Sequence, residues 1–280
     1  MIKVISYISI VLVLFFSTPG HAAPASTQQI QELMELSGLT KQVYDFPGII
    51  KHSVEQQNGG NIPKPIIYLL AESVDKSILP AEIMAGIEER LQQNIQDDEA
   101  KELLKWYKSE LGKTITLAEI KSSAPDAVQK VMEQAQSLQQ QTSYIAFAKR
   151  LDDLLGATDM SLSMARFSAI AAYSAAMKTQ SPDAPVDLTP IESALKATES
   201  EMRTDMQNMV ILIFVYTYQG IDQKSLAQYE TFLKTQSAQK FYDLIIESMR
   251  EGLETSILKW TNDIGYILKD IPASKRHGSE

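Results

Sequence analysis

The side chains that could do chemistry are few and scattered in this chain of 280 residues. Beyond the N-terminal stretch there are two histidines, His52 in a predicted helix and His277 near the end, and neither has a second metal ligand at helical spacing. Cysteine is absent, which excludes disulfides, thiolate catalysis and cysteine-ligated metals. His52 is therefore interpreted as a surface histidine, and the sequence predicts no metal site.

Clustered carboxylates also have simpler interpretations than catalysis. Asp97, Asp98 and Glu99 could hold a cation, but they open a predicted helix, where negative charge is favoured in any case. Asp152 and Asp153 are adjacent, so they point in different directions on a helix and make a poor acid–base pair. The sequence thus predicts a protein that is not an enzyme, with no catalytic residue and no cofactor.

The composition and charge of the chain limit the kinds of partner that it could bind. A formal charge of −9 argues against nucleic acid, because proteins that track phosphates concentrate lysine and arginine. The content of 44% hydrophobic and 22% charged residues is ordinary for a globular domain. The most apolar internal segment, residues 209–218, is half the length of the roughly 20 residues that span a bilayer. We therefore expect no integral membrane span after removal of the N-terminal stretch.

The N-terminal stretch is typical of a signal peptide. Lys3 supplies a positive start, residues 4–16 are an apolar run, and residues 17–22 are small and polar. Cleavage after Ala22 gives a signal peptide of residues 1–22, and cleavage after Ala25 is the alternative. The predicted location is periplasmic, or secreted.

Helical periodicity runs through the rest of the chain, and no segment shows the sustained alternation of a half-buried strand. One long helix is predicted to start near Asp126, and Thr189 is predicted to cap another helix through a capping box with Glu192. The final residues, 271–280, are expected to be disordered. The predicted fold class is all-α.

A helix-to-helix corner occurs twice. The segment 106–113, Trp-Tyr-Lys-Ser-Glu-Leu-Gly-Lys, returns as 232–239, Phe-Leu-Lys-Thr-Gln-Ser-Ala-Gln. In each copy large apolar residues end one helix, a hydroxyl residue caps the next, and a small residue allows close approach of the helices. The residues of this structural motif are Trp106, Tyr107, Ser109 and Gly112 in the first corner and Phe232, Thr235 and Ala238 in the second.

The two corners belong to a longer internal repeat. At a shift of 126 residues, Ile83 and Ile87 also fall on Met209 and Ile213. We therefore expect a helical array of two pseudo-repeated halves, each of about five to six helices. Repeat 1 covers residues 27–125, a connecting helix covers 126–147, and repeat 2 covers 148–270.

The first corner resembles the Phe-Tyr-x-Ser-x-x-Gly-x signature of exported bacterial helical domains in the domain-of-unknown-function family twenty-fifty-nine. The opening at residues 32–39 is similar to the usual start of that family. The second corner departs from the signature at Leu233, Thr235 and Ala238, so its membership follows only through the repeat. The resemblance implies an all-helical, exported protein and brings no known activity or site.

Two functions fit these observations. The first is a non-enzymatic adaptor that binds an unknown envelope protein through a helical face. The second is a carrier or sensor of an apolar small molecule, because methionine and aromatic side chains gather in the second half and adapt to irregular ligands. The candidate apolar pocket consists of Met164, Phe167, Tyr173, Met209 and Phe214.

Overall fold

The computed structural model describes residues 23–56, 64–124, 126–181 and 184–269. Within these ranges the regular structure is α-helical, apart from one bridge pair between Pro24 and Gln96. The all-α prediction is confirmed. The helices are α1 (Thr27–Leu36), α2 (Leu39–Gln56), α3 (Lys64–Ser77), α4 (Pro80–Asn94), α5 (Asp97–Lys108), α6 (Glu110–Ser122), α7 (Ala127–Leu138), α8 (Thr142–Leu155), α9 (Ala157–Gln180), α10 (Thr189–Tyr218), α11 (Gln223–Leu233) and α12 (Gln236–Lys269).

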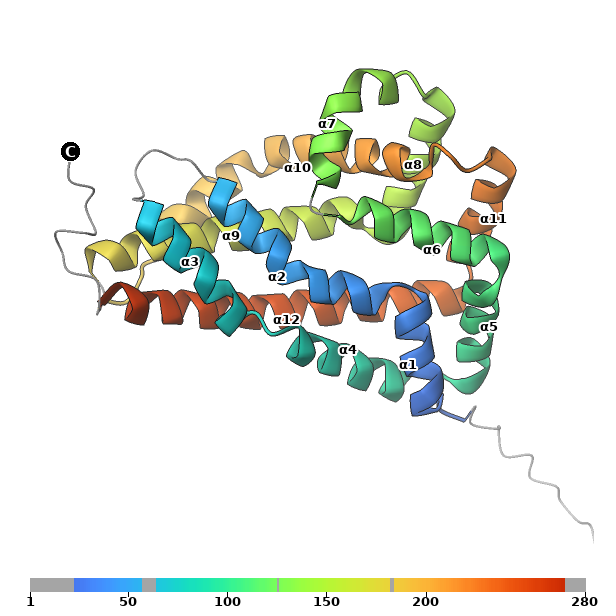
Figure 1. Ribbon diagram of the computed structural model, residues 1–280, viewed down its shortest axis with the longest axis horizontal. Helices are drawn as coiled ribbons and strands as arrows, with labels where there is room; N and C mark the ends of the chain where they lie inside the picture. Colours follow the sequence, from blue (N-terminus) through green and yellow to red (C-terminus); the bar gives the residue numbers. More distant parts are fainter. Residues whose placement is uncertain (1–22, 57–63, 125, 182–183, 270–280) are drawn as a thin grey trace, which may run out of the picture.

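The long helix α12 runs along the molecule and joins its two halves (Figure 1). It packs against α9 of its own half and against α3, α4 and α5 of the first half. Helices α7 and α8 pack against α10 on the upper side of Figure 1, and α6 also contacts α10. Helices from the N-terminal and C-terminal parts of the chain therefore pack against one another.

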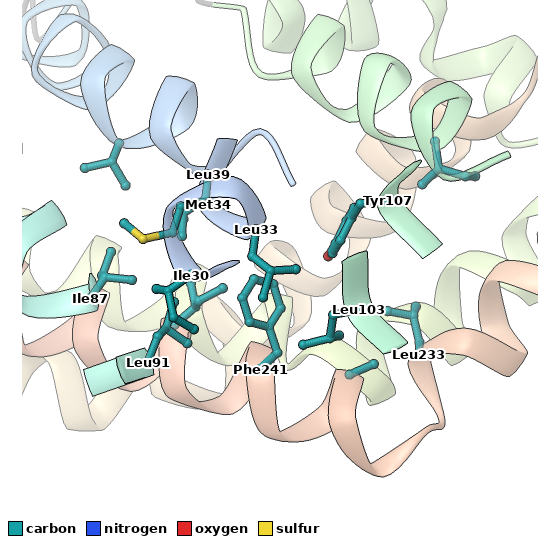
Figure 2. Packing of buried hydrophobic residues seen from close by; sticks show 14 of the residues in the cluster. Ile30, Leu33, Met34, Leu39, Ile87, Leu91, Leu103, Tyr107, Leu233 and Phe241 are labelled. Carbon is teal, nitrogen blue, oxygen red and sulfur yellow. The ribbon is translucent and has the colours of Figure 1, made fainter. Parts of the chain in front are cut away.

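The main core lies where these halves meet. Figure 2 shows side chains from α1, α2, α4, α5, α11 and α12 pointing toward one another, with Leu33 of α1 beside Phe241 of α12. Leu33, Phe241 and Leu103 are fully buried. A smaller cluster of Val131, Leu138, Ala148, Ile211 and Val215 lies between α7, α8 and α10. Burial of this apolar area is the main stabilising term for such a fold.

Both corners have the geometry that their spacing predicts. Ser109 Oγ accepts a hydrogen bond from Gly112 N at 3.0 Å, and Thr235 Oγ1 accepts one from Ala238 N at 3.2 Å. At Gly112 an added Cβ would lie 2.1 Å from the carbonyl oxygen of Trp106. Glycine is therefore required at the first corner, because the end of α5 folds directly onto the start of α6.

The predicted connecting helix over residues 126–147 is wrong as one element. The structure divides it into α7 and α8, joined through Gln139, Gln140 and Gln141. The side chains of these three glutamines are polar, so they add no apolar side chain to the packing on α10. The break lets Val131 and Leu138 of α7 and Ala148 of α8 all pack on α10, so tertiary burial overrides the continuous periodicity.

The predicted capping box at Thr189 is also wrong. Thr189 is the first residue of α10, Leu188 precedes it without a side-chain cap, and Asp187 Oδ1 accepts a hydrogen bond from Thr189 N at 3.0 Å. A carboxylate is a stronger acceptor than a hydroxyl for a free amide at a helix start, and it suits the positive end of the helix.

Several predictions fall outside the described residues: the signal peptide at 1–22, the tail at 271–280, His277 and the side chain of His52. In the part of the chain that the structure does describe, no helix is long and apolar enough to cross a membrane.

Candidate ligand-binding site

A cavity of about 370 Å³ lies between the two halves. Residues of α2, α5 and α6 line it from the N-terminal part of the chain, and residues of α8, α9, α10, α11 and α12 line it from the C-terminal part. Its size falls within the range of small-molecule sites. Its lining includes one carboxylate, Glu119, and six aromatic side chains: Tyr107, Phe214, Tyr218, Tyr229, Phe241 and Tyr242.

The corners bring these side chains to one place. Tyr107 is in the last turn of α5, and Phe241 and Tyr242 are in the second turn of α12, which the second corner begins. Phe214 and Tyr218 are one turn apart at the end of α10. The site is thus assembled from helix ends that meet at the seam, not from one helix.

Glu119 is the hub of a hydrogen-bond network. Its Oε1 atom accepts hydrogen bonds from the hydroxyls of Tyr218 and Tyr229, each at 2.7 Å. Beside it, the hydroxyls of Tyr107 and Tyr242 are 3.1 Å apart and share a hydrogen bond. Over the described ranges, no donor reaches the second oxygen of Glu119, Oε2. Half of the carboxylate is therefore unused by the protein.

The surroundings of Glu119 disfavour its charge. Its side chain is half-buried by accessible area, yet protein atoms surround it, and this desolvation raises the pKa of Glu119 although two tyrosine hydroxyls stabilise the carboxylate. Burial, followed by the nearby Glu119, raises the pKa of Tyr218 and Tyr229 well above their ordinary values. These tyrosines are consequently neutral donors at physiological pH.

The site is also free of positive charge. The side chains that line the cavity in the described part of the chain include no Lys, Arg or His. Aromatic faces carry partial negative charge, and the phenol oxygens and Glu119 Oε2 add lone pairs. The cavity is therefore built to accept hydrogen bonds and positive charge.

The sequence-predicted pocket coincides with this site at one residue. Phe214 lines the cavity, whereas Met164 and Phe167 pack at the edge of the main core and Met209 packs on the smaller cluster. Tyr173 is half-buried on α9 and does not line this cavity. The second half supplies much of the lining, but the first half supplies Tyr107 and the carboxylate.

Sequence reasoning missed Glu119, Tyr229 and Tyr242. A signal for Glu119 was available, because it follows Ile115 by four residues and so lies on the buried face of α6. An acidic residue on an apolar helical face requires a partner or a function. The tyrosines carried no comparable signal, since tyrosine at a core position is common.

The other carboxylates singled out in the sequence have structural roles. Glu99 Oε2 accepts a hydrogen bond from Gln96 N at the start of α5, and Asp97 pairs with Lys101. The buried Asp152 accepts hydrogen bonds from both the backbone N and the hydroxyl of Thr158, at 2.7 and 2.6 Å. Over the described ranges no group of three or more potential ligands is arranged to hold a metal ion.

Comparison with known proteins gives a family match for one segment of the chain. Neither the curated proteins nor the solved structures give a match. Residues 81–143 match the model of a family described as "Uncharacterized protein conserved in bacteria (DUF2059)". The matched segment contains the first corner, Tyr107 and Glu119. Over residues 81–143 the chain is therefore similar to the DUF2059 family, which confirms the resemblance seen at the first corner.

Proposed function

We propose that this protein is an exported, non-enzymatic binding protein that carries or senses a small molecule held in the cavity between its halves. One observation carries the proposal: the lining of a cavity of about 370 Å³ combines six aromatic side chains with a carboxylate that has one oxygen unused by the described residues. Pockets with an apolar lining and a few convergent polar groups are typical of ligand sites.

A duplication that gave rise to the two halves supports a site on their seam. The helices α5 and α11 begin at positions 126 apart, as do α6 and α12. The helices α2 and α9 each begin just after a glycine in the left-handed region, Gly38 with φ 76° and Gly156 with φ 61°. The starts of α2 and α9 are 118 residues apart, so the shift differs from that of the later helices, but the order of starts and turns is the same, as in a duplicated domain with an insertion.

The packing between the halves is reciprocal. Helix α12 of the second half covers α3 and α4. In turn, α6 of the first half and α7 of the connecting segment cover α10, which corresponds to α3 and α4 in the proposed repeat. Such an exchange is the arrangement of a two-fold dimer fused into one chain. The lining of the cavity needs both halves, so neither half alone completes the site.

The contacts of residues 23–25 bear on where the proposed signal peptide would be cleaved. The carbonyl of Ala23 accepts a hydrogen bond from Asp97 N at 2.8 Å, and Ala25 N donates to the Ile95 carbonyl at 3.0 Å. Ala25 is buried. Cleavage after Ala22 keeps these contacts, whereas cleavage after Ala25 removes them, so we place the mature N-terminus at Ala23 in the periplasm or outside the cell.

The adaptor hypothesis is the second candidate, and exposed apolar side chains favour it. Val128 and Met132 lie one turn apart on α7 and are 52% and 55% exposed. A partner helix could cover this pair. The face is small, which is why we rank the adaptor below the ligand carrier.

Native mass spectrometry of the protein purified from its own periplasm tests the carrier. We expect an added mass that disappears on denaturation. The variant Ala157→Trp, which fills the cavity, should lose this mass, and Ala194→Trp on the exposed face of α10 is the matched control. A protein without added mass, together with a stoichiometric protein partner lost in a Val128→Ser, Met132→Ser variant, would replace the carrier by the adaptor.

A further inference from the structure

We propose that the ligand is a cationic amine with an apolar body, bound with its nitrogen between Glu119 Oε2 and the aromatic rings. This inference rests on the proposed function and specifies the chemistry of the same site. It follows from three properties of the cavity: an unused carboxylate oxygen, six aromatic side chains in the lining, and no basic side chain among the lining residues in the described part of the chain.

The first step concerns the carboxylate. Glu119 Oε1 receives both tyrosine hydroxyls, and no lysine or arginine forms an ion pair with Glu119 over the described residues. A half-buried carboxylate without a counter-charge is disfavoured, and an opposite charge beside it recovers part of that cost. An ammonium group against Oε2 would supply both the counter-charge and a hydrogen-bond donor.

The second step concerns the rings. Phe214, Tyr218 and Tyr229 form a contiguous group, with ring centroids 6.2 Å apart for Phe214 and Tyr218 and 6.0 Å apart for Tyr218 and Tyr229. Ring faces attract cations within about 6 Å of the centroid, more strongly where water is excluded. Aromatic faces beside a carboxylate therefore recognise a positively charged nitrogen far better than a neutral polar group.

The third step concerns the rest of the ligand. Beyond the network, the lining includes neutral polar side chains as well as aliphatic and methionine ones; the latter include Leu155, Met160, Ile213, Ile246 and Met249, and the former are Ser37, Gln42, Ser122, Ser123 and Thr217. An alkyl or aryl body fits this part by burial of apolar area. A fatty acid fits the same part equally well, but its carboxylate would face Glu119, and like charges at such a site repel. The negative charge of Glu119 should therefore make the cavity bind an amine in preference to a carboxylic acid of the same chain length.

A matched ligand series tests this inference: n-octylamine, n-octanol and n-octanoate, titrated by calorimetry at pH 7 into the full chain beginning at Ala23. We expect saturable binding of octylamine, weaker binding of octanol by about tenfold or more, and no binding of octanoate. The order of the three ligands on the unmodified protein tests the inference without any variant.

The variant Glu119→Gln keeps the shape and an acceptor for Tyr218 and Tyr229 but removes the charge. It should weaken octylamine about tenfold or more and leave octanol unchanged. Glu254→Gln, an exposed position on α12 that loses the same charge, is the control and should change neither affinity. Octanol or octanoate binding as tightly as octylamine would overturn the cationic ligand while leaving the carrier in place. Failure of all three to bind, with no mass on the native protein, would overturn the carrier as well.

Discussion

The indole of Trp106 lies flat on the ring of Phe232, with centroids 4.4 Å apart and planes 7° from parallel. These two residues occupy equivalent positions of the two corners in the repeat. In a two-fold interface, a residue close to the axis contacts its own equivalent. The stacked pair therefore marks where the axis relating the two proposed halves would pass, a short distance from the cavity.

Truncation of this pair gives the first prediction. Trp106→Ala and Phe232→Ala should each lower the free energy of unfolding by about 3 to 5 kcal/mol, through lost burial and the cavity left behind. The double variant should lose less than the sum of the two by about 0.5 to 1.5 kcal/mol, the usual coupling of a stacked pair. Urea denaturation measures all three. Additive losses would mean that the rings contribute only by separate burial.

The first corner gives a sharper test, because its glycine has a matched control. Gly112→Ala would place a Cβ 2.1 Å from the Trp106 carbonyl oxygen, so we expect a loss of more than about 1 kcal/mol. Gly86→Ala, in the middle of α4 with nothing within 4 Å of the added Cβ, should instead stabilise by about 0.5 to 1 kcal/mol. Thermal unfolding would show melting temperatures moving in opposite directions. A stabilising Gly112→Ala would contradict the close contact at the corner.

Loss of the cap at the same corner should be milder. Ser109→Ala removes the acceptor for Gly112 N and should cost about 1 kcal/mol. Ser109→Asp keeps an acceptor at the start of α6 and should restore most of that stability. Equal stability of Ser109→Ala and the unmodified protein would show that water satisfies the amide.

The sequence predicts local features of this fold better than distant ones. The corners were predictable because a hydroxyl cap and a required glycine are set by backbone geometry within a few residues. The break at Gln139–Gln141 was not, because α7 and α8 separate only to pack on α10, which is distant in sequence. Thr189 failed as a cap for a local reason, a better acceptor at Asp187.

The candidate site was less predictable than the fold for the same reason. Its members come from eight helices, α2, α5, α6, α8, α9, α10, α11 and α12, and no spacing along the chain relates them. Phe214 could be nominated because aromatic and methionine residues are dense around it. Glu119 could have been nominated from its helical face alone, but its tyrosine partners are 99 and 110 residues away.

The position of signal cleavage is testable through the contacts of the mature N-terminus. We expect intact mass measurement of the protein from the periplasm to show a chain that begins at Ala23. A recombinant chain that begins at Ser26 lacks the hydrogen bonds of Ala23 and Ala25 and should be less stable by about 1 to 3 kcal/mol. Full-length chains retained in the membrane fraction would contradict export with cleavage.

The last prediction concerns the charge of Glu119. Desolvation raises its pKa in the folded protein above the ordinary value of 4.5, so the folded state holds this proton more tightly than the unfolded chain does. The contribution of Glu119 to stability is therefore fully present at pH below the unfolded pKa and is lost as the pH rises through the raised folded pKa. The neighbouring Tyr107, Tyr218, Tyr229 and Tyr242 have pKa values well above the ordinary one and stay neutral throughout this window.

Comparison of the protein with Glu119→Gln isolates this effect, because the other carboxylates titrate in both. In the absence of ligand, the stability of Glu119→Gln relative to the unmodified protein should increase from pH 4 to pH 8, measured by urea unfolding at each pH. With octylamine present, the unmodified protein should instead gain stability relative to Glu119→Gln between pH 4 and pH 8. The reason is that an ammonium group against Oε2 favours the ionised carboxylate and lowers the pKa of Glu119. A difference between the two proteins that does not change with pH would mean that water or another donor already satisfies Oε2, and that no cation is needed there.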